Sequence, residues 1–247
     1  MEASRLELPG GGQFDTLAPA YDAWYDTPLG RVVDRLESGA VLGLVGEGPG
    51  AWALDLSCGT GRYALALARR GLRVVGVDIS EPMLLVARAK AREAGCDLRL
   101  VRADARALPF RAGTVDLVTI ILGLEFVGEP RGVLEGCHRV LVPGGSLVIA
   151  ILNRAGLWTV WRRLKRLVVP SVWGGATFLS PAELGDLLRA RGFTGLRWRG
   201  AVHFLPLLGR RRVGWLERWE AIGARWMPGR ATFVAVAEAV VLTASSP

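Results

Sequence analysis

A glycine-containing stretch near residue 58 carries the residues best suited to chemistry. Residues 55–61 read Asp-Leu-Ser-Cys-Gly-Thr-Gly at the end of an apolar run, and a helical pattern begins near Arg62. Glycine lets a backbone approach a ligand closely, and free N–H groups at a helix start favour a carboxylate or a phosphate. Gly59-x-Gly61-x-x-Ala64 also fits the dinucleotide fingerprint, and a purely structural turn fits it as well. The stretch predicts a turn that binds the charged tail of a ligand, with both alternatives open.

Three acidic residues recur at the ends of successive apolar runs: Asp55, Asp78 and Asp104. In an open α/β sheet such ends meet at one edge, where ligands bind. Asp78 would accept both hydroxyls of a ribose. Asp104, with the backbone N–H of Ala105, would read an adenine edge. Asp55 would hold an ammonium group, directly or through water, so the three carboxylates predict a nucleoside site.

These residues need a sheet to position them. Apolar runs alternate with helical patterns, and the predicted strands are 52–57, 73–79, 98–103, 115–122 and 146–152, followed by 196–204 and 232–242. Strands that are apolar on both faces and separated by helices indicate right-handed βαβ units. The prediction is a doubly wound, Rossmann-like α/β fold with a mostly parallel sheet, an antiparallel C-terminal strand and helices on both faces.

Capping residues between these strands indicate where helices begin and end. Helices are predicted over 63–70, 83–94 and 212–226, and Ser80-Glu81-Pro82 provides an N-cap with proline in the first turn. Ser180-Pro181-Ala182-Glu183 is a capping-box pattern that opens another helix, which ends by Gly192. One domain is expected over 1–247, with a cofactor-binding core over 14–152, an acceptor insertion over 153–178 and the end of the sheet over 179–247.

Composition places the chain among globular proteins, since 51% of its residues are hydrophobic and 22% are charged. The longest apolar runs, 115–127 and 231–244, are shorter than the ~20 residues that span a bilayer. Residues 1–9 lack the basic and apolar regions of a secretory signal, so a cytoplasmic protein is expected. The three cysteines stand far apart, which argues against a disulfide framework and a zinc site, and no metal site is predicted.

The net charge of +8 comes almost wholly from arginine. It indicates an acidic partner or a coding bias. Nucleic acid is not the favoured partner, because net charge by itself bears on association and does not identify what is bound. The basic segment 154–166 joins tryptophans to cations: Trp158, Trp161, Arg162, Arg163, Lys165 and Arg166. It suits a lid, a contact with an anionic membrane surface, or an ordinary solvated helix whose tryptophans pack inward. Arg210-Arg211-Arg212 ahead of Trp215 and Trp219 would extend the same face.

Further motifs follow the binding turn in a fixed order. They are Phe14-Asp15-x-x-Ala18-x-x-Tyr21-Asp22-x-Trp24, Leu54 to Gly61, Val77-Asp78-Ile79-Ser80, Met83-Leu84, Asp104-Ala105-x-x-Leu108-Pro109-Phe110, Asp116-Leu117-Val118 and Arg139-Val140-Leu141-x-Pro143-Gly144-Gly145. With these motifs the chain resembles class I S-adenosylmethionine-dependent methyltransferases, most of all the branch similar to the ubiquinone and menaquinone biosynthesis enzymes (methyltransferase type 11). The resemblance covers residues 14–152, with a weaker echo to 243.

The resemblance implies S-adenosylmethionine as cofactor and a small-molecule acceptor. It assigns the methionine tail to Gly59 and Gly61, the ribose to Asp78, the adenine face to Ile79 and Met83, the adenine edge to Asp104 and Ala105, and the methionine end to Tyr21 and Arg62. Ser57 stands where the family usually has the first glycine of its loop, and with Asp55 it completes the predicted cofactor site.

The segment after the fourth strand departs from the family. Relatives often carry a polar or His-His pair there, and this chain reads Leu124-Glu125-Phe126. Glu125 is the candidate catalytic residue, a general base for an acceptor hydroxyl or amine, and the alternative is an exposed or capping glutamate. His138 falls in a helical pattern and is expected to be structural. For His203, in a C-terminal strand, an approach to the pocket is the less favoured alternative.

The predicted reaction is methyl transfer by in-line displacement to a small lipophilic or aromatic acceptor. The cofactor is already activated, so the enzyme's work is to align the acceptor and exclude water. Two alternatives remain open: an NAD-dependent oxidoreductase, and a non-catalytic module that binds S-adenosylmethionine or associates with RNA. The sequence leaves the acceptor atom and the oligomeric state open.

Overall fold

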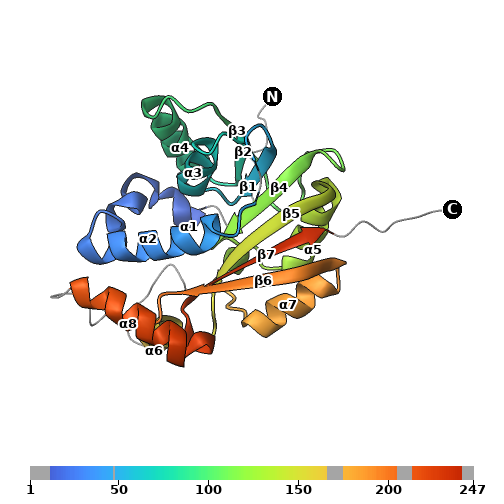
Figure 1. Cartoon of the computed structure of the whole chain (residues 1–247). Helices are drawn as coiled ribbons and strands as arrows, with labels where there is room; N and C mark the ends of the chain where they lie inside the picture. The colour runs from blue at the N-terminus through green and yellow to red at the C-terminus, as the bar shows by residue number, and fades with distance from the viewer. Residues whose placement is uncertain (1–11, 47, 166–174, 205–212, 241–247) are drawn as a thin grey trace.

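A mixed sheet forms the centre of the computed structural model, which describes residues 12–46, 48–165, 175–204 and 213–240. Within these residues seven strands run in the order β3-β2-β1-β4-β5-β7-β6 (Figure 1). Their bounds are β1 (Trp52–Leu56), β2 (Arg73–Asp78), β3 (Leu98–Arg102), β4 (Val115–Ile121), β5 (Leu141–Leu152), β6 (Phe193–Ala201) and β7 (Phe233–Val240).

The pairing confirms the predicted fold class. The pairs β3-β2, β2-β1, β1-β4 and β4-β5 are parallel, whereas β7 pairs antiparallel with both β5 and β6. The order reverses on either side of β1, between β2 and β4, which is where open α/β sheets bind ligands. The carboxyl ends of the parallel strands therefore converge on one edge.

Helices cover both faces of the sheet, as predicted. On one face α2 (Pro28–Leu42), α3 (Arg62–Ala68), α6 (Leu157–Lys165) and α8 (Val213–Trp226) contribute to one buried cluster. On the other face α5 (Pro130–Val140) and α7 (Pro181–Arg189) pack against a second cluster. The remaining elements are α1 (Gly12–Asp15), η1 (Ala18–Trp24), α4 (Glu81–Glu93), η2 (Leu124–Phe126) and η5 (Pro228–Arg230).

The predicted helix caps are confirmed. The Ser80 hydroxyl accepts from the backbone N–H of Met83 at the start of α4, and Ser180 and Glu183 form the reciprocal capping box of α7. Each cap satisfies backbone donors that have no partner inside the helix. No helix in the described ranges is long and apolar enough to cross a bilayer.

Three strands differ from the sequence prediction. β6 runs over Phe193–Ala201 rather than 196–204, because its pairing with β7 begins at Phe193 and ends at Ala201. β3 is not apolar on both faces, because it is an edge strand whose Arg99 and Arg102 are exposed. β5 begins at Leu141 rather than at Ser146, and its register with β4 shifts between Val115 and Leu117. The turn at residues 143–145 therefore lies inside β5, as an irregularity that the sequence presents as a strand boundary.

Candidate functional site

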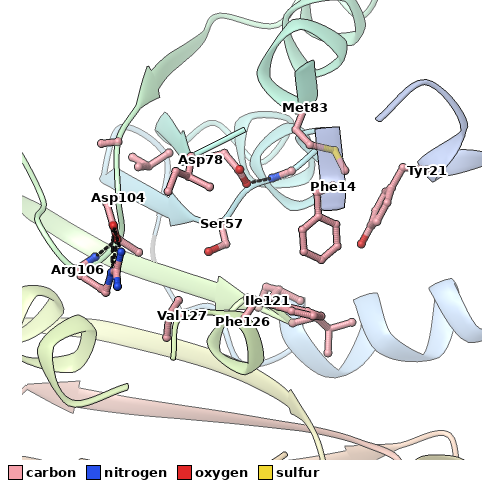
Figure 2. Close-up of a pocket in the computed structure, with 17 residues that line it drawn as sticks. Phe14, Tyr21, Ser57, Asp78, Met83, Asp104, Arg106, Ile121, Phe126 and Val127 are labelled. Carbon is pink, nitrogen blue, oxygen red and sulfur yellow. Dashed lines mark hydrogen bonds and ion pairs between the residues drawn. The ribbon is translucent and has the colours of Figure 1, made fainter. Parts of the chain in front are cut away.

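A pocket opens at the carboxyl ends of β1, β2 and β4, and its close-up is drawn in Figure 2. It holds about 840 Å³ of space, part of it open to solvent. Asp104 and Arg106 lie at one end, and Phe14 and Tyr21 lie at the other (Figure 2). The pocket is thus elongated, with a charged end and an aromatic end.

The glycine turn is held in left-handed backbone conformations. Ser57, Gly59 and Gly61 have φ values of 55°, 53° and 76°. A Cβ on Gly59 would meet no atom within 4 Å, whereas one on Gly61 would lie 3.0 Å from the Cβ of Ala87. Gly59 therefore faces the pocket, while Gly61 is needed for the close approach of α4 and for the first turn of α3.

Asp78 ends β2 and lines the pocket. Its Oδ2 accepts from the Gly59 N–H at 2.8 Å and its Oδ1 from the Ser80 N–H at 2.9 Å. Burial raises the pKa of Asp78, and these backbone hydrogen bonds counteract the rise. Since each carboxylate oxygen has more than one acceptor site, the group remains able to accept from a ligand.

Asp104 lines the charged end of the pocket, but its carboxylate is occupied by Arg106. Arg106 donates through Nε to Asp104 Oδ1 and through Nη2 to Oδ2, at 3.0 and 2.5 Å. These hydrogen bonds lower the pKa of Asp104. Ala105 lines the pocket beside them. A ligand edge read by Asp104 must therefore compete with the Arg106 guanidinium.

Asp55 lies outside the pocket lining. It sits within β1 rather than after it, and its Oδ1 accepts from the Thr119 hydroxyl at 2.6 Å. Burial raises its pKa to about 7. The carboxyl thus links the neighbouring strands β1 and β4, and the structure does not place it on the surface of the pocket, where a direct contact with a ligand ammonium would require it.

Glu125 is neither exposed nor a cap, which corrects both parts of the alternative considered for it. The side chain is buried, its Oε1 accepts from the Leu152 N–H at 2.6 Å, and Oε2 has no hydrogen-bond partner among the described residues. Burial raises its pKa to about 7. Its backbone oxygen also accepts from Thr177. Because Glu125 is absent from the pocket lining, its placement gives no support to a role as acceptor base.

The aromatic end is built from residues far apart in the chain. Phe14 and Phe126 pack edge to face with ring centroids 4.9 Å apart, and Tyr21 lies beside them (Figure 2). Burial raises the pKa of Tyr21, so its hydroxyl is protonated at neutral pH. The predicted adenine-face residues Ile79 and Met83 also line the pocket.

Arg62 lies outside this lining. Its guanidinium pairs with Asp34 and stacks over the Tyr25 ring, 3.4 Å from the centroid. It therefore holds η1 and α2 together behind Tyr21, and the structure does not bring it to the pocket.

Hydrogen bonds tie the segment before α2 to the loops of the pocket. Asp22 accepts from the Thr60 hydroxyl at 2.9 Å and from Lys90 Nζ at 2.7 Å. Asp15 accepts from the Ser80 hydroxyl. Together with the Phe14 contact, these bonds close the pocket with residues that precede the sheet in the chain.

The two histidines do not reach the pocket. His138 is exposed on α5, where its ring packs against Phe193 as a structural contact. His203 is buried, with Nδ1 2.9 Å from Glu220 Oε1, and the same carboxylate accepts from the His203 backbone N–H. The less favoured alternative for His203, an approach to the pocket, is excluded because Glu220 of α8 holds the ring.

The basic segment is described in part. Trp158 is buried and packs against Trp24, and Arg162 lies over the Trp158 ring, 4.9 Å from its centroid. Trp161 is half-buried. The side chains of Arg163 and Lys165, together with Arg166 and residues 210–212, lie outside the described residues. Trp158 thus packs inward, as expected for an ordinary solvated helix.

Several lining residues were not proposed as site residues from the sequence, and they are Phe14, Val77, Ala103, Arg106, Ile121, Leu122, Gly123, Phe126 and Val127. Four of these residues follow β4, and one of the four, Leu122, has a φ of 55°, which is rare for a side chain of its size. The position directly after a central parallel strand was the available signal.

Residues 54–149 match the family described as "Methyltransferase domain". The chain is 40% identical to a demethylmenaquinone methyltransferase of Thermus thermophilus over 161 residues. This alignment covers 57% of this chain and 73% of that protein. A demethylmenaquinone methyltransferase of Clavibacter sepedonicus is 43% identical over 60% of this chain and 61% of its own length.

Solved structures share the fold. The crystal structure of a SAM-dependent methyltransferase from Thermotoga maritima superposes with a TM-score of 0.73 at 22% identity, covering 93% of this chain and 98% of that one. At this identity the match concerns the fold alone.

Proposed function

Because the chain belongs to the S-adenosylmethionine-dependent methyltransferases, we propose that it transfers a methyl group to a quinol, the reduced and aromatic form of a quinone, which loses a proton as S-adenosylhomocysteine forms. Family membership removes the NAD-dependent oxidoreductase as an alternative. The observation that carries the acceptor class is the aromatic end of the pocket, where Phe14, Phe126 and Tyr21 offer two ring faces and one hydroxyl. The names of the relatives from Thermus and Clavibacter support the same class.

The residues of the pocket fit the cofactor. The open space above Gly59 admits a ligand against the backbone, and Asp78 offers carboxylate oxygens to ribose hydroxyls. Ile79 and Met83 supply apolar surface for adenine. Ala105 offers the backbone beside the adenine edge, and Asp104 becomes available there once Arg106 releases it. Ser57 and Gly59 leave room for the methionine tail.

The cofactor supplies a methyl group that is already activated by a sulfonium. The protein's contribution is to place the acceptor in line with that methyl and to exclude water. Phe14 and Phe126 stack against an aromatic ring and keep solvent out, while the neutral Tyr21 hydroxyl donates a hydrogen bond to an acceptor oxygen. Asp78 and Asp104, the acidic residues among those lining the pocket, serve the cofactor end.

Turnover with defined acceptors tests the proposal. Calorimetric titration with S-adenosylmethionine, S-adenosylhomocysteine and NAD comes first, and we expect both adenosyl ligands, but not NAD, to bind. The protein is then given S-adenosylmethionine with a short-chain naphthoquinol, a benzoquinol or an aliphatic amine, and methylated products are identified by mass spectrometry.

We expect methylation of a quinol and none of the amine. Methylation of the amine alone would overturn the acceptor class. Cofactor binding with no turnover on any acceptor would favour the non-catalytic module. The proposal moves Tyr21 from the methionine end, where the resemblance puts it, to the acceptor, so a Tyr21→Phe variant should raise KM for the quinol and leave the Kd of S-adenosylhomocysteine unchanged. A weaker Kd would return Tyr21 to the methionine end.

A further inference from the structure

The outer surface of α8 carries a stripe of exposed apolar side chains. Trp215, Trp219, Ile222 and Trp226 are separated by four, three and four residues, which is the spacing of one helical face. Trp219 is 43% exposed, Ile222 47% and Trp226 74%. These four residues are called the tryptophan stripe below. An exposed apolar stripe of this length marks an interaction surface rather than scattered surface residues.

The face of α8 next to the stripe is anchored to the rest of the protein. Leu216 is fully buried, Glu220 accepts from the backbone N–H groups of Val202 and His203, and a Cβ on Gly223 would lie 2.3 Å from the Cβ of His203. These three residues form a narrow inner face at the same helical spacing. The helix is therefore anchored on one side, and the neighbouring side that carries the stripe is exposed to solvent.

The charge around the stripe is positive. Arg218 and Arg225 are exposed next to it on the helix, and no ion pair in the described ranges involves either. Both acidic residues of α8 are engaged by the protein itself, since Glu217 pairs with Arg35 of α2 and Glu220 holds His203. The whole chain has a net charge of +8. An anionic partner complements this face.

The stripe lies at the same end of the sheet as the pocket. α8 leads from β6 to β7, so it sits where the parallel strands end, together with α1, α2 and α6 (Figure 1). Of the large apolar side chains that are exposed in the described residues, Trp24 of η1, Val160 of α6 and the five between 215 and 227 come from this end. Leu85 and Trp198 are the exceptions.

We infer that the tryptophan stripe docks the protein on the surface of an anionic phospholipid bilayer. A helix with tryptophan on one side and arginine beside it lies in the plane of a membrane interface, with indole rings at the headgroup level and guanidinium groups against phosphates. Docking through α8 turns the pocket end of the sheet toward the membrane. The inference concerns a surface and goes beyond the proposed acceptor, because it needs neither cofactor nor acceptor.

A second copy of the chain fits this face less well. A twofold contact through α8 would bring Arg218 and Arg225 of the two copies together, and like charges across an interface are unfavourable. A bilayer that contains phosphatidylglycerol supplies the opposite charge and an apolar layer in one partner.

Sedimentation with vesicles tests the inference in the absence of any methylation. The full chain is mixed with phosphatidylcholine vesicles that contain or lack phosphatidylglycerol. We expect binding to the anionic vesicles, a blue shift of tryptophan fluorescence, and weakening by salt. The variant Trp219→Ala/Trp226→Ala should reduce binding about tenfold or more, since it removes most of the inserted apolar area.

Trp198→Ala is the matched control, because Trp198 is an exposed tryptophan of β6 outside the stripe, and it should bind vesicles like the wild type. Arg218→Gln/Arg225→Gln should lose the preference for anionic vesicles. All these variants should keep the Kd of S-adenosylhomocysteine, which separates this test from that of the proposed function.

Three results would overturn the inference: wild-type protein that does not sediment with anionic vesicles, a double tryptophan variant that binds them as well as the wild type, or a wild-type dimer in solution that the double variant converts to a monomer. The last result would assign the stripe to a second copy of the chain.

Discussion

The two ends of the pocket are built in different ways. At the part of the pocket assigned to the cofactor, the geometry depends mainly on the backbone. Ser57 and Gly59 adopt left-handed backbone angles, and Asp78 accepts hydrogen bonds from two backbone N–H groups. At the aromatic end, side chains from distant segments meet, as Phe14 meets Phe126. A backbone requirement restricts which residue types fit, whereas packing between side chains is met by many combinations. The first kind of construction leaves a motif in the sequence and the second does not.

Removing the Asp78 carboxylate should have the largest effect on the cofactor end. Asp78→Ala should weaken the binding of S-adenosylhomocysteine about 100-fold, because hydrogen bonds to a charged group are lost and the Gly59 and Ser80 N–H groups lose their acceptor. Calorimetric titration measures the change, and circular dichroism checks that the variant folds. Unchanged affinity in a folded variant would show that Asp78 does not bind the ribose. It would also remove the distinction between a cofactor site built by the backbone and an aromatic end built by side chains.

Gly123→Ala tests the contact between the glycine turn and the segment that follows β4. A Cβ on Gly123 would lie 2.4 Å from the Cβ of Ser57, so the variant should lose about 1–3 kcal/mol of unfolding free energy. Ser57→Gly in the same chain removes the colliding atom and should recover most of the loss. Urea denaturation of the two single variants and the double variant gives the coupling. Additive losses would show that the Ser57 side chain is not the obstacle.

Glu125 should make stability depend on pH. Its folded pKa of about 7 is above the usual 4.5, so the folded state holds the proton more tightly, and the associated stability is present below pH 4.5 and is lost as the pH rises to 7. Glu125→Gln should flatten this fall by on the order of 3 kcal/mol, since the pKa rises from 4.5 to about 7 and each pKa unit is worth about 1.4 kcal/mol.

Thermal unfolding at pH 5 and at pH 8 provides the measurement. Glu93→Gln, at an exposed glutamate of α4, is the control that should keep the wild-type slope. Asp55 and Glu37 share the direction of this shift, so a residual slope is expected. A Glu125→Gln slope equal to that of the wild type would show that this carboxyl is ionised in the folded protein.

Arg106→Gln should have the smallest effect. It frees the Asp104 carboxylate from a partly exposed ion pair, which is worth about 0–1 kcal/mol, so affinity for S-adenosylhomocysteine should rise by up to about fivefold. Titration calorimetry measures whether the affinity for S-adenosylhomocysteine rises or falls in this variant. A tenfold loss of affinity would mean that Arg106 itself holds the cofactor and that the adenine edge is read differently.

The sequence could predict the sheet, the glycine turn and the carboxylate ends because each follows from a local rule. Asp78 ends its strand, and Gly59 occupies an angle that side chains avoid. Asp55 shows the limit of the rule: it lies one residue before the end of β1, and its carboxyl turns to Thr119. In the pairing of β1 with β2, Asp55 lies opposite Gly76, two residues before Asp78, so the two carboxylates share a face of the sheet but Asp55 lies further from its carboxyl edge.

The aromatic end could not be predicted, because its contacts join segments that no periodicity links. Phe14 precedes the sheet and Phe126 follows β4, and only the folded chain brings them together. Glu125 was a reasonable candidate from its position, yet its carboxyl turns to the Leu152 N–H instead of the pocket. His203 likewise turns to Glu220, since a buried ring nitrogen takes the nearest carboxylate.

The place of β7 has a consequence for how the chain is made. β7 lies between β5 and β6 although it follows both in the sequence, and among the described strands it is the partner of β6. During synthesis, β5 and β6 keep open edges until residues 233–240 have left the ribosome. The open edge of β5, whose side chains from Leu147 to Leu152 are buried in the folded protein, invites aggregation. A chain interrupted before Phe233 would therefore emerge as a substrate for chaperones and proteases rather than as a smaller enzyme.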